Sequence, residues 1–168
     1  DMETGKEKKK GEAGELWVRG YATMSSYWDK PEETAETKDK EGWVHSGDMA
    51  MIRPDDMLVF MGRYKDMLKV GGENVSPAEV EAYLRNMPEI LDAAVVSYPD
   101  QRLAEIPVAF IILMVGETLD KKELVNRMKG KIASFKIPRY FLFVTSFPMT
   151  PSGKIRKIEL RDIALKQI

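Results

Sequence analysis

The sequence predicts an α+β fold in which a mixed sheet flanked by helices is preceded by a segment of short β-strands. Three observations lead to this prediction. Short apolar runs separated by Gly and Pro fill residues 1–62. From residue 67 onward, strand-like runs alternate with helical patterns that carry start signals. Two runs, at residues 90–98 and 106–115, are almost continuously hydrophobic, which is typical of strands covered on both faces.

Residues 1–62 are expected to form short strands and one short helix. Residues 15–20 alternate in polarity, and residues 31–35 place proline and acids where the first turn of a helix favours them. Residues 42–45 are expected to be a short strand that runs into a Ser-Gly-Asp turn. Strands at 49–53 and 57–61 then form a hairpin. These strands lack the length for an independent core.

Residues 67–168 are expected to form a complete small domain. Ser76 as N-cap, with Pro77 and Glu79 after it, predicts the start of a helix, and Pro88 predicts its end. Two more helices are predicted over residues 120–132 and 158–168, with a strand at residues 140–144 between them. The predicted order is strand, helix, two strands, helix, strand and helix.

The composition is that of an ordinary globular protein and excludes several kinds of site. The chain has 168 residues, 32% charged and 43% hydrophobic, with a formal net charge of −1. This balance gives no field that would attract nucleic acid, so no nucleic-acid partner is expected. The absence of cysteine excludes thiolate metal sites, and a single histidine argues against a histidine zinc site or a Ser-His-Asp triad. No apolar run approaches the roughly 20 residues of a membrane span.

Asp48 and Arg63 are the first candidate binding residues. Asp48 could be a turn aspartate that bonds to its own backbone, or a carboxylate that accepts two ribose hydroxyl groups at the end of a strand. Arg63 could be a surface arginine, or a donor to ribose or phosphate that approaches the same place across the hairpin.

The other candidates are Lys154 and the pair Gly71-Gly72. Lys154 follows Pro-Ser-Gly in a turn, where a lysine is usually solvated, but its ammonium could instead stabilise negative charge on an acyl phosphate. Ile155 follows it, so the segment is not a Walker phosphate loop. Gly71-Gly72 predicts a turn and lacks the three-glycine spacing of dinucleotide-binding folds.

Read together, four segments resemble one enzyme superfamily. Residues 15–28 contain Glu-Leu-Trp-Val-Arg-Gly and end in Tyr-Trp, and residues 43–48 read Trp-Val-His-Ser-Gly-Asp, with Ser46 where the family has Thr. Residues 62–72 contain Gly-Arg-x-Lys-Asp and end in Gly-Gly, and residues 148–154 end in Gly-Lys. These segments resemble the C-terminal part of the adenylate-forming enzymes, which include acyl-CoA synthetases, luciferases and peptide-synthetase adenylation domains. Residues 71–81 are most like medium- or long-chain fatty-acid–CoA ligases.

The resemblance implies a role for each matching residue. Asp48 would bind the ribose hydroxyl groups of ATP and AMP, and Arg63 would contact ribose and phosphate oxygens. Lys65 would be the hinge residue, and Lys154 the catalytic lysine that contacts the acyl carboxylate and the α-phosphate. After a domain swing, CoA would be contacted by Lys69, Gly71, Gly72, Glu73 and Arg102, with Lys136 and Arg139 as further candidates for its phosphates.

The resemblance also predicts that the chain is part of a longer enzyme. Residues 1–62 would be the incomplete end of the large N-terminal AMP-binding domain, residues 63–66 the hinge, and residues 67–168 the mobile C-terminal domain. The family's phosphate loop, adenine-binding segment and acyl pocket are outside this sequence, so the Mg²⁺ ligands are expected elsewhere and the chain alone is expected to be inactive. The implied substrates are a carboxylic acid, ATP and CoA, and the implied partner is the remaining N-terminal domain.

Two alternatives stay open. The chain could belong to an adenylation domain that loads a carrier protein, although no carrier-type Gly-x-Ser follows Lys154. It could also be a non-catalytic binding module, although Asp48, Arg63, Lys65 and Lys154 are all present. The lack of a signal peptide and of cysteine predicts a cytoplasmic location.

Overall fold

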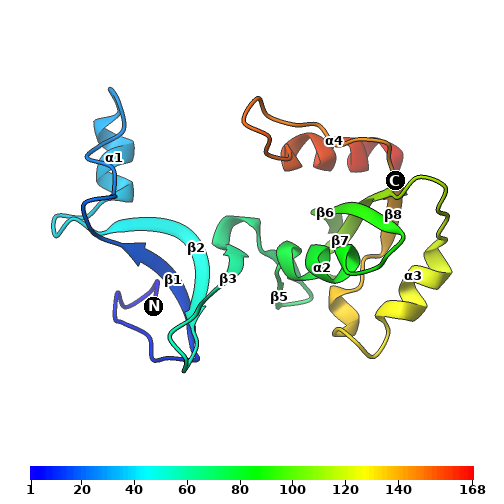
Figure 1. The fold of residues 1–168 in the computed structure, drawn as a ribbon, viewed down its shortest axis with the longest axis horizontal. Coiled ribbons are helices and arrows are strands. Elements are labelled where there is room, and N and C mark those ends of the chain that lie inside the picture. Colours follow the sequence, from blue (N-terminus) through cyan, green and yellow to red (C-terminus); the bar gives the residue numbers. More distant parts are fainter. The chain divides into compact units, whose positions relative to one another are not determined.

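The structure, a computed structural model, describes residues 1–168, which divide into two compact units, Asp1–Lys65 and Asp66–Ile168. The first unit is a three-stranded antiparallel sheet in the order β1-β2-β3 (Figure 1). Its elements are β1 (Ala13–Val18), α1 (Pro31–Thr37), β2 (Val44–Ile52) and β3 (Leu58–Arg63). The hairpin and the helix at Pro31 agree with the sequence predictions.

β2 corrects one prediction. The sequence predicted two strands separated by a Ser-Gly-Asp turn, whereas Ser46, Gly47 and Asp48 lie inside one continuous strand. Gly47 has φ +70°, and the pairing of β2 with β3 shifts between Met49 and Ala50. A glycine in the left-handed region can form an irregularity within a strand as well as a turn. β2 therefore continues through Gly47 with a local irregularity instead of ending there.

The second unit contains a five-stranded mixed sheet, which confirms the predicted fold class. Four strands are antiparallel in the order β5-β4-β7-β6, and β8 pairs in parallel with β7. The strands are β4 (Leu68–Val70), β5 (Glu73–Val75), β6 (Ile90–Asp100), β7 (Ala104–Leu113) and β8 (Tyr140–Phe143). The helices are α2 (Pro77–Arg85), α3 (Lys121–Met128) and α4 (Lys157–Gln167), with single 3₁₀ turns at Tyr64–Asp66 and Ser134–Lys136.

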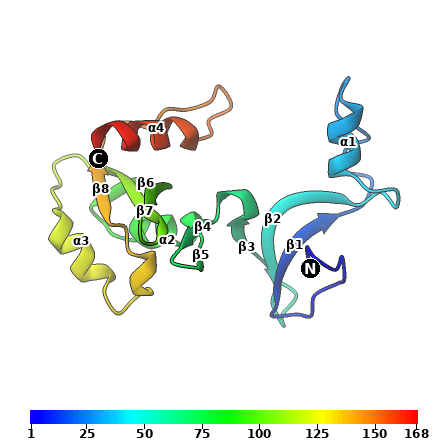
Figure 2. The ribbon, with the colours of Figure 1, turned by 180° about the vertical axis from the view of Figure 1, so that it is seen from behind.

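β6 and β7 are buried on both faces, as their continuous hydrophobicity predicted. Figures 1 and 2 show α4 on one side of these strands and α2 on the other. Successive residues of a strand point to opposite faces, so the two strands supply two separate clusters. One cluster joins Ala93, Val95, Ala109 and Ile111 to Val80, Leu84, Leu124 and Met128 of α2 and α3; the other joins Ala94, Val96, Val108 and Phe110 to Leu160 and Ala164 of α4.

The helix starts follow their predicted signals, with differences in detail. Pro77 is the first residue of α2, and Ser76 precedes it in an extended conformation without a side-chain capping bond. Asp120 caps α3 by accepting a hydrogen bond from the Glu123 amide at 2.8 Å. α3 ends at Met128, earlier than the predicted residue 132, and Gly130 follows with φ +72°. None of the helices combines the length and the hydrophobicity of a membrane span.

A buried carboxylate joins α2 to β6 and α4. The side chain of Glu81 is only 8% exposed, and its Oε1 accepts hydrogen bonds from the Val95 amide at 2.8 Å and from Lys157 Nζ at 2.6 Å. A buried charge is costly unless it is paired and hydrogen-bonded, and this one is both. The ion pair fixes the first residue of α4 against α2.

Replacing Ala104 by glycine is expected to stabilise the second unit. Ala104 lies at the turn between β6 and β7 with φ +64°, where a Cβ atom costs about 1–2 kcal/mol. Glycine loses about 0.5–1 kcal/mol through its larger unfolded-state entropy, so a net gain of about 0.5–1 kcal/mol is expected. Urea unfolding of the two proteins measures the difference, and a lower midpoint for Ala104→Gly would contradict this account.

Acid is expected to destabilise the second unit through Glu89. The Arg127 guanidinium donates to Glu89 at 2.9 and 3.0 Å, and this lowers the pKa of Glu89 from its ordinary 4.5. A carboxyl whose pKa is lowered by folding contributes stability that is complete above 4.5 and is lost as the pH falls through the folded value. Urea midpoints of the wild type should therefore fall more steeply below pH 4.5 than those of Glu89→Gln. Parallel curves would contradict the prediction.

Candidate functional site

Asp48 and Arg63 lie opposite each other on β2 and β3. Arg63 Nε donates to Asp48 Oδ1 at 2.8 Å, and Arg63 Nη2 donates to the Ser46 carbonyl at 3.1 Å. The Asp48 amide donates to Ser46 Oγ at 3.0 Å, which fixes the backbone next to the carboxylate. Both charged side chains remain partly exposed, at 27% for Asp48 and 46% for Arg63. The structure therefore brings the two candidates together as a solvent-accessible ion pair.

Glu15 supports this pair and was not singled out from the sequence. Its Oε1 accepts from the Gly47 amide at 3.0 Å, and its Oε2 accepts from the Trp17 indole at 2.6 Å. Trp17 in turn stacks on His45, with ring centroids 3.9 Å apart. His45 therefore packs within the first unit. The alternation of residues 15–20 identified a strand, but it gave no indication that the carboxylate would reach across to β2.

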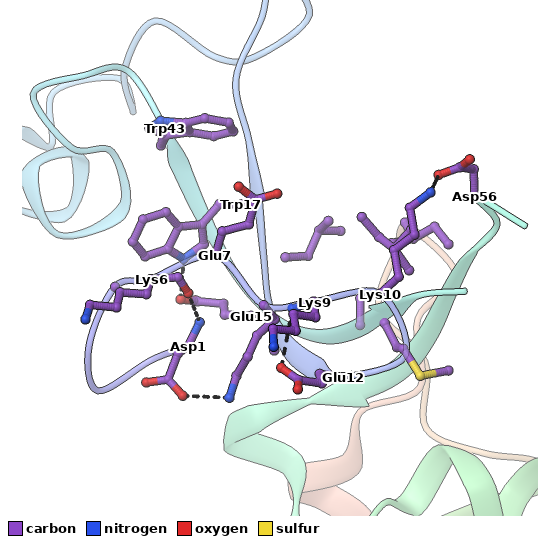
Figure 3. Close-up of a pocket in the computed structure, with 18 residues that line it drawn as sticks. Asp1, Lys6, Glu7, Lys9, Lys10, Glu12, Glu15, Trp17, Trp43 and Asp56 are labelled. Carbon is purple, nitrogen blue, oxygen red and sulfur yellow. Dashed lines mark hydrogen bonds and ion pairs between the residues drawn. The ribbon is translucent and has the colours of Figure 1, made fainter. Parts of the chain in front are cut away.

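The cavity in the first unit does not include the candidate pair. It has a volume of about 520 Å³ and is lined by β1, β2 and the segment that precedes β1 (Figure 3). Several of its charges are paired with one another: Lys8 with Asp1, and Lys10 with Asp56. Neither Asp48 nor Arg63 lines it. Glu15, which bonds to the Gly47 amide, does line it.

Lys65 and the Gly71-Gly72 turn flank the start of the second unit. Lys65 is exposed, lies in the 3₁₀ turn Tyr64–Asp66 and is the last residue of the first unit. Gly71 and Gly72 join β4 to β5 as a two-residue hairpin turn, with φ +60° and +91°. The Lys69 ammonium bonds to Asn74 Oδ1 across this hairpin, and Glu73 is exposed.

The turn between β6 and β7 places Arg102 beside the glycine pair. The Gly71 amide donates to the Leu103 carbonyl at 2.8 Å, so the residue after Arg102 contacts the turn directly. Two further cations proposed for CoA phosphates are already paired: Lys136 with Glu79 at 2.7 Å, and Arg139 with Asp100 at 2.7 Å. Arg102 differs because no carboxylate pairs with its exposed side chain.

Lys154 is presented by a compact turn in front of α4. The Thr150 amide donates to the Lys154 carbonyl at 2.8 Å, and the Lys154 amide donates to Thr150 Oγ1 at 3.0 Å. Gly153 has φ +78°, and Met149 pairs with Ile155 to close the turn. The ammonium makes no ion pair, so the fold fixes the backbone and leaves the charge available. Such a group can meet developing negative charge on a substrate.

Two carboxylates near the Gly71-Gly72 turn were not predicted from the sequence as functional residues. Asp100 accepts from the Leu103 amide at 2.9 Å, and Glu105 Oε2 accepts from the Lys69 amide at 2.7 Å. An Asp after Pro99, in the short break between two apolar runs, is a turn signal that could have identified Asp100. No local pattern connects Glu105 with Lys69, because 36 residues separate them.

Comparison with known proteins agrees with the sequence resemblance. A family model described as the AMP-binding enzyme C-terminal domain matches residues 79–154. The mitochondrial medium-chain acyl-CoA ligase ACSF2 of Rattus norvegicus is 43% identical over 162 residues, covering 96% of this chain and 26% of the relative. The chain thus spans about a quarter of the length of the curated relatives it matches.

Solved structures of adenylate-forming enzymes are also similar. The amide bond synthetase McbA of Marinactinospora thermotolerans has 34% identity and a TM-score of 0.89, covering 96% of this chain and 33% of McbA. The o-succinylbenzoate-CoA synthetase MenE of Bacillus subtilis, solved with its acyl-adenylate intermediate, has 29% identity and a TM-score of 0.85, covering 92% of this chain and 31% of MenE. The chain is therefore similar, over almost its whole length, to a portion of acyl-CoA ligases, and its residues 79–154 match the AMP-binding enzyme C-terminal domain.

Proposed function

We propose that the chain is part of an ATP-dependent acid–CoA ligase that works through an acyl-adenylate. In the first step a carboxylate oxygen bonds to the α-phosphorus of ATP and pyrophosphate leaves. In the second step the CoA sulfur bonds to the acyl carbon, AMP leaves and the thiol proton is released. The observation that carries the proposal is the 43% identity to a medium-chain acyl-CoA ligase over 96% of this chain.

Asp48 and Arg63 are the proposed ribose-binding residues. Arg63 Nε already donates a hydrogen bond to Asp48 Oδ1, and Arg63 Nη2 donates one to the Ser46 carbonyl. Asp48 Oδ2 and Arg63 Nη1 then remain for the hydroxyl groups of the nucleotide and a phosphate oxygen. A carboxylate fixed by a guanidinium is a preorganised acceptor, which limits the entropy lost on binding.

Lys154 and the Gly71-Gly72 turn are proposed to serve the two steps in succession. The Lys154 ammonium would contact the acyl carboxylate and the α-phosphate while the adenylate forms. The Gly71-Gly72 turn, with Lys69, Glu73 and Arg102, would then line the path of CoA. Residues 63–66 would be the hinge between residues 1–62 and the mobile domain 67–168. The boundary between compact units at Lys65 and Asp66 supports that position.

Substrate selection and metal binding are assigned to the rest of the polypeptide. A medium- or long-chain fatty acid is the proposed substrate class, in keeping with the resemblance of residues 71–81 to fatty-acid–CoA ligases. The described residues contain no group of three acids or histidines that could hold a metal ion. The Mg²⁺ that accompanies ATP is proposed to be held by phosphates and by residues outside this chain. A cytoplasmic location stays a prediction, since the rat relative is named as mitochondrial.

Carboxylate-dependent exchange between ATP and pyrophosphate in the full-length enzyme tests the proposal. Fatty acids of increasing length should support exchange, and Asp48→Ala should weaken it through a higher KM for ATP. Absence of exchange with every acid would support the non-catalytic alternative and overturn the proposal.

The identity of the acyl acceptor needs a separate test, because the similar protein McbA is an amide bond synthetase. Acyl-adenylate supplied to the enzyme should be consumed with CoA. If the acyl-adenylate is consumed only with an amine or a carrier protein, that molecule and not CoA is the acyl acceptor. The proposed adenylation step would be unaffected.

A further inference from the structure

We propose that the turn between β6 and β7, residues 100–105, positions the Gly71-Gly72 turn, and that Glu105 is the positioning residue that joins them. The inference rests on the proposed function, in which the Gly71-Gly72 turn lines the path of CoA during thioester formation. Glu105 itself would contact neither CoA nor the acyl group. It would act through the backbone of Lys69.

The contact between β4 and β7 is short and depends on a side chain. Val70 opposite Ala104 is its one pair of ladder residues. The amides on either side of Val70 both bond to the β6–β7 turn: the Lys69 amide to Glu105 Oε2 at 2.7 Å, and the Gly71 amide to the Leu103 carbonyl at 2.8 Å. One of the two bonds is therefore made to a carboxylate, and a charged acceptor makes roughly twice as strong a bond as a neutral one.

The two glycines have different surroundings. A Cβ atom on Gly71 would lie 3.1 Å from Leu103 Cδ2, whereas one on Gly72 would meet no atom within 4 Å. Gly71 is thus the residue that packs against the β6–β7 turn, and Gly72 is the residue that faces open space. This arrangement leaves the outer side of the glycine turn free for a ligand while its inner side is held.

The β6–β7 turn is itself firmly fixed. Asp100 Oδ1 accepts from the amides of Leu103 at 2.9 Å and Arg102 at 3.0 Å, and Asp100 Oδ2 accepts from Arg139 Nη1 at 2.7 Å. The bonds from the backbone amides of Leu103 and then Arg102 lower the pKa of Asp100 from its ordinary 3.8. A rigid support of this kind can hold a short hairpin in one geometry.

Apart from the burial of Leu68, Val70 and Val75 in the core, β4 and β5 are joined to the rest of the unit at this end only through β7. Each strand has three residues, and two-stranded hairpins are marginally stable on their own. Loss of the Glu105 carboxylate leaves the Lys69 amide without its acceptor, so that only the backbone pairing at Val70 and Ala104 and the Gly71 bond to Leu103 join the hairpin to the β6–β7 turn. A displacement of about 1 Å in such a site can cost about 100-fold in rate.

The test compares Glu105→Ala and Glu105→Gln in the full-length enzyme. With supplied acyl-adenylate and CoA, Glu105→Ala should slow thioester formation about tenfold or more while ATP–pyrophosphate exchange stays within about twofold. Glu105→Gln keeps a carbonyl acceptor and should recover most of the rate. Amide hydrogen exchange of the full-length enzyme should become about tenfold faster at Lys69 and Gly71 in Glu105→Ala, with Val95 unchanged.

Glu89→Ala is the matched control. It removes another carboxylate of the second unit, one that pairs with Arg127 and makes no contact with residues 69–71. It should affect both half-reactions alike. If Glu105→Ala behaves in the same way, Glu105 is a general structural residue and the inference is overturned.

Failure of the proposed function has a different signature. If the wild-type enzyme forms the acyl-adenylate but transfers no acyl group to CoA, the proposal that CoA is the acceptor is wrong. The hydrogen-exchange comparison then decides the inference. Unchanged exchange at Lys69 and Gly71 in Glu105→Ala overturns it, and faster exchange at both supports the positioning role.

Discussion

Lys154→Ala is expected to abolish acyl-adenylate formation and to leave thioester formation from supplied acyl-adenylate intact. The side chain extends from a closed backbone turn and makes no ion pair, so its removal should leave the fold unchanged. Loss of one preorganised charge that stabilises a transition state costs about 100- to 1000-fold in rate. ATP–pyrophosphate exchange measures the first step, and consumption of synthetic acyl-adenylate with CoA measures the second.

Lys154→Arg and Lys157→Ala separate the role of charge from that of structure. Arginine keeps the charge and should retain part of the exchange rate. Lys157→Ala removes the partner of Glu81 and should lower stability through an unpaired buried carboxylate. If Lys154→Ala slows the consumption of supplied acyl-adenylate as much as it slows exchange, the assignment of Lys154 to the first step is wrong.

Lys65→Pro is expected to have the opposite effect, with adenylate formation kept and thioester formation reduced about 100-fold. Proline fixes φ at its own position and disfavours helical backbone at the residue before it, here Tyr64. Lys65 is exposed and lies in the 3₁₀ turn at the boundary of the two units, so the substitution should restrict that turn more than it disturbs either core. The same two half-reaction assays measure the result.

Lys65→Ala is the control for the loss of the side chain. It keeps backbone freedom and should support both half-reactions. If Lys65→Pro and Lys154→Ala impair the same half-reaction, the account of two conformations is wrong. If Lys65→Ala is as slow as Lys65→Pro in thioester formation, the side chain rather than the freedom of the backbone is responsible.

The fold was largely predictable because its main signals are local. The proline at the first position of α2 and the continuous hydrophobicity of β6 and β7 gave the architecture of the second unit. Gly47 was misinterpreted because a positive φ is compatible with a turn and with an irregular strand alike, and the choice depends on pairing with β1 and β3. The pairing is a tertiary property that the local sequence does not encode.

The candidate site was predictable where a contact follows from strand register. Asp48 and Arg63 meet because a hairpin brings its two strands opposite each other. Glu15, Glu81 and Glu105 were not identified, since each bonds to backbone or side chains in a different element. Nothing in the periodicity around them distinguishes these carboxylates from surface charges.

The ion pair of Glu81 with Lys157 has a consequence for the timing of the two half-reactions. α2 follows directly from the hairpin that carries Gly71-Gly72, and α4 follows directly from the turn that carries Lys154. Because the ion pair joins α2 to α4, we expect the two groups to move together as parts of one unit. Presenting one group to a fixed reaction centre would then withdraw the other. Under the proposed function, such a block would act as an interlock, in which a thiol is admitted only after Lys154 has left the reaction centre.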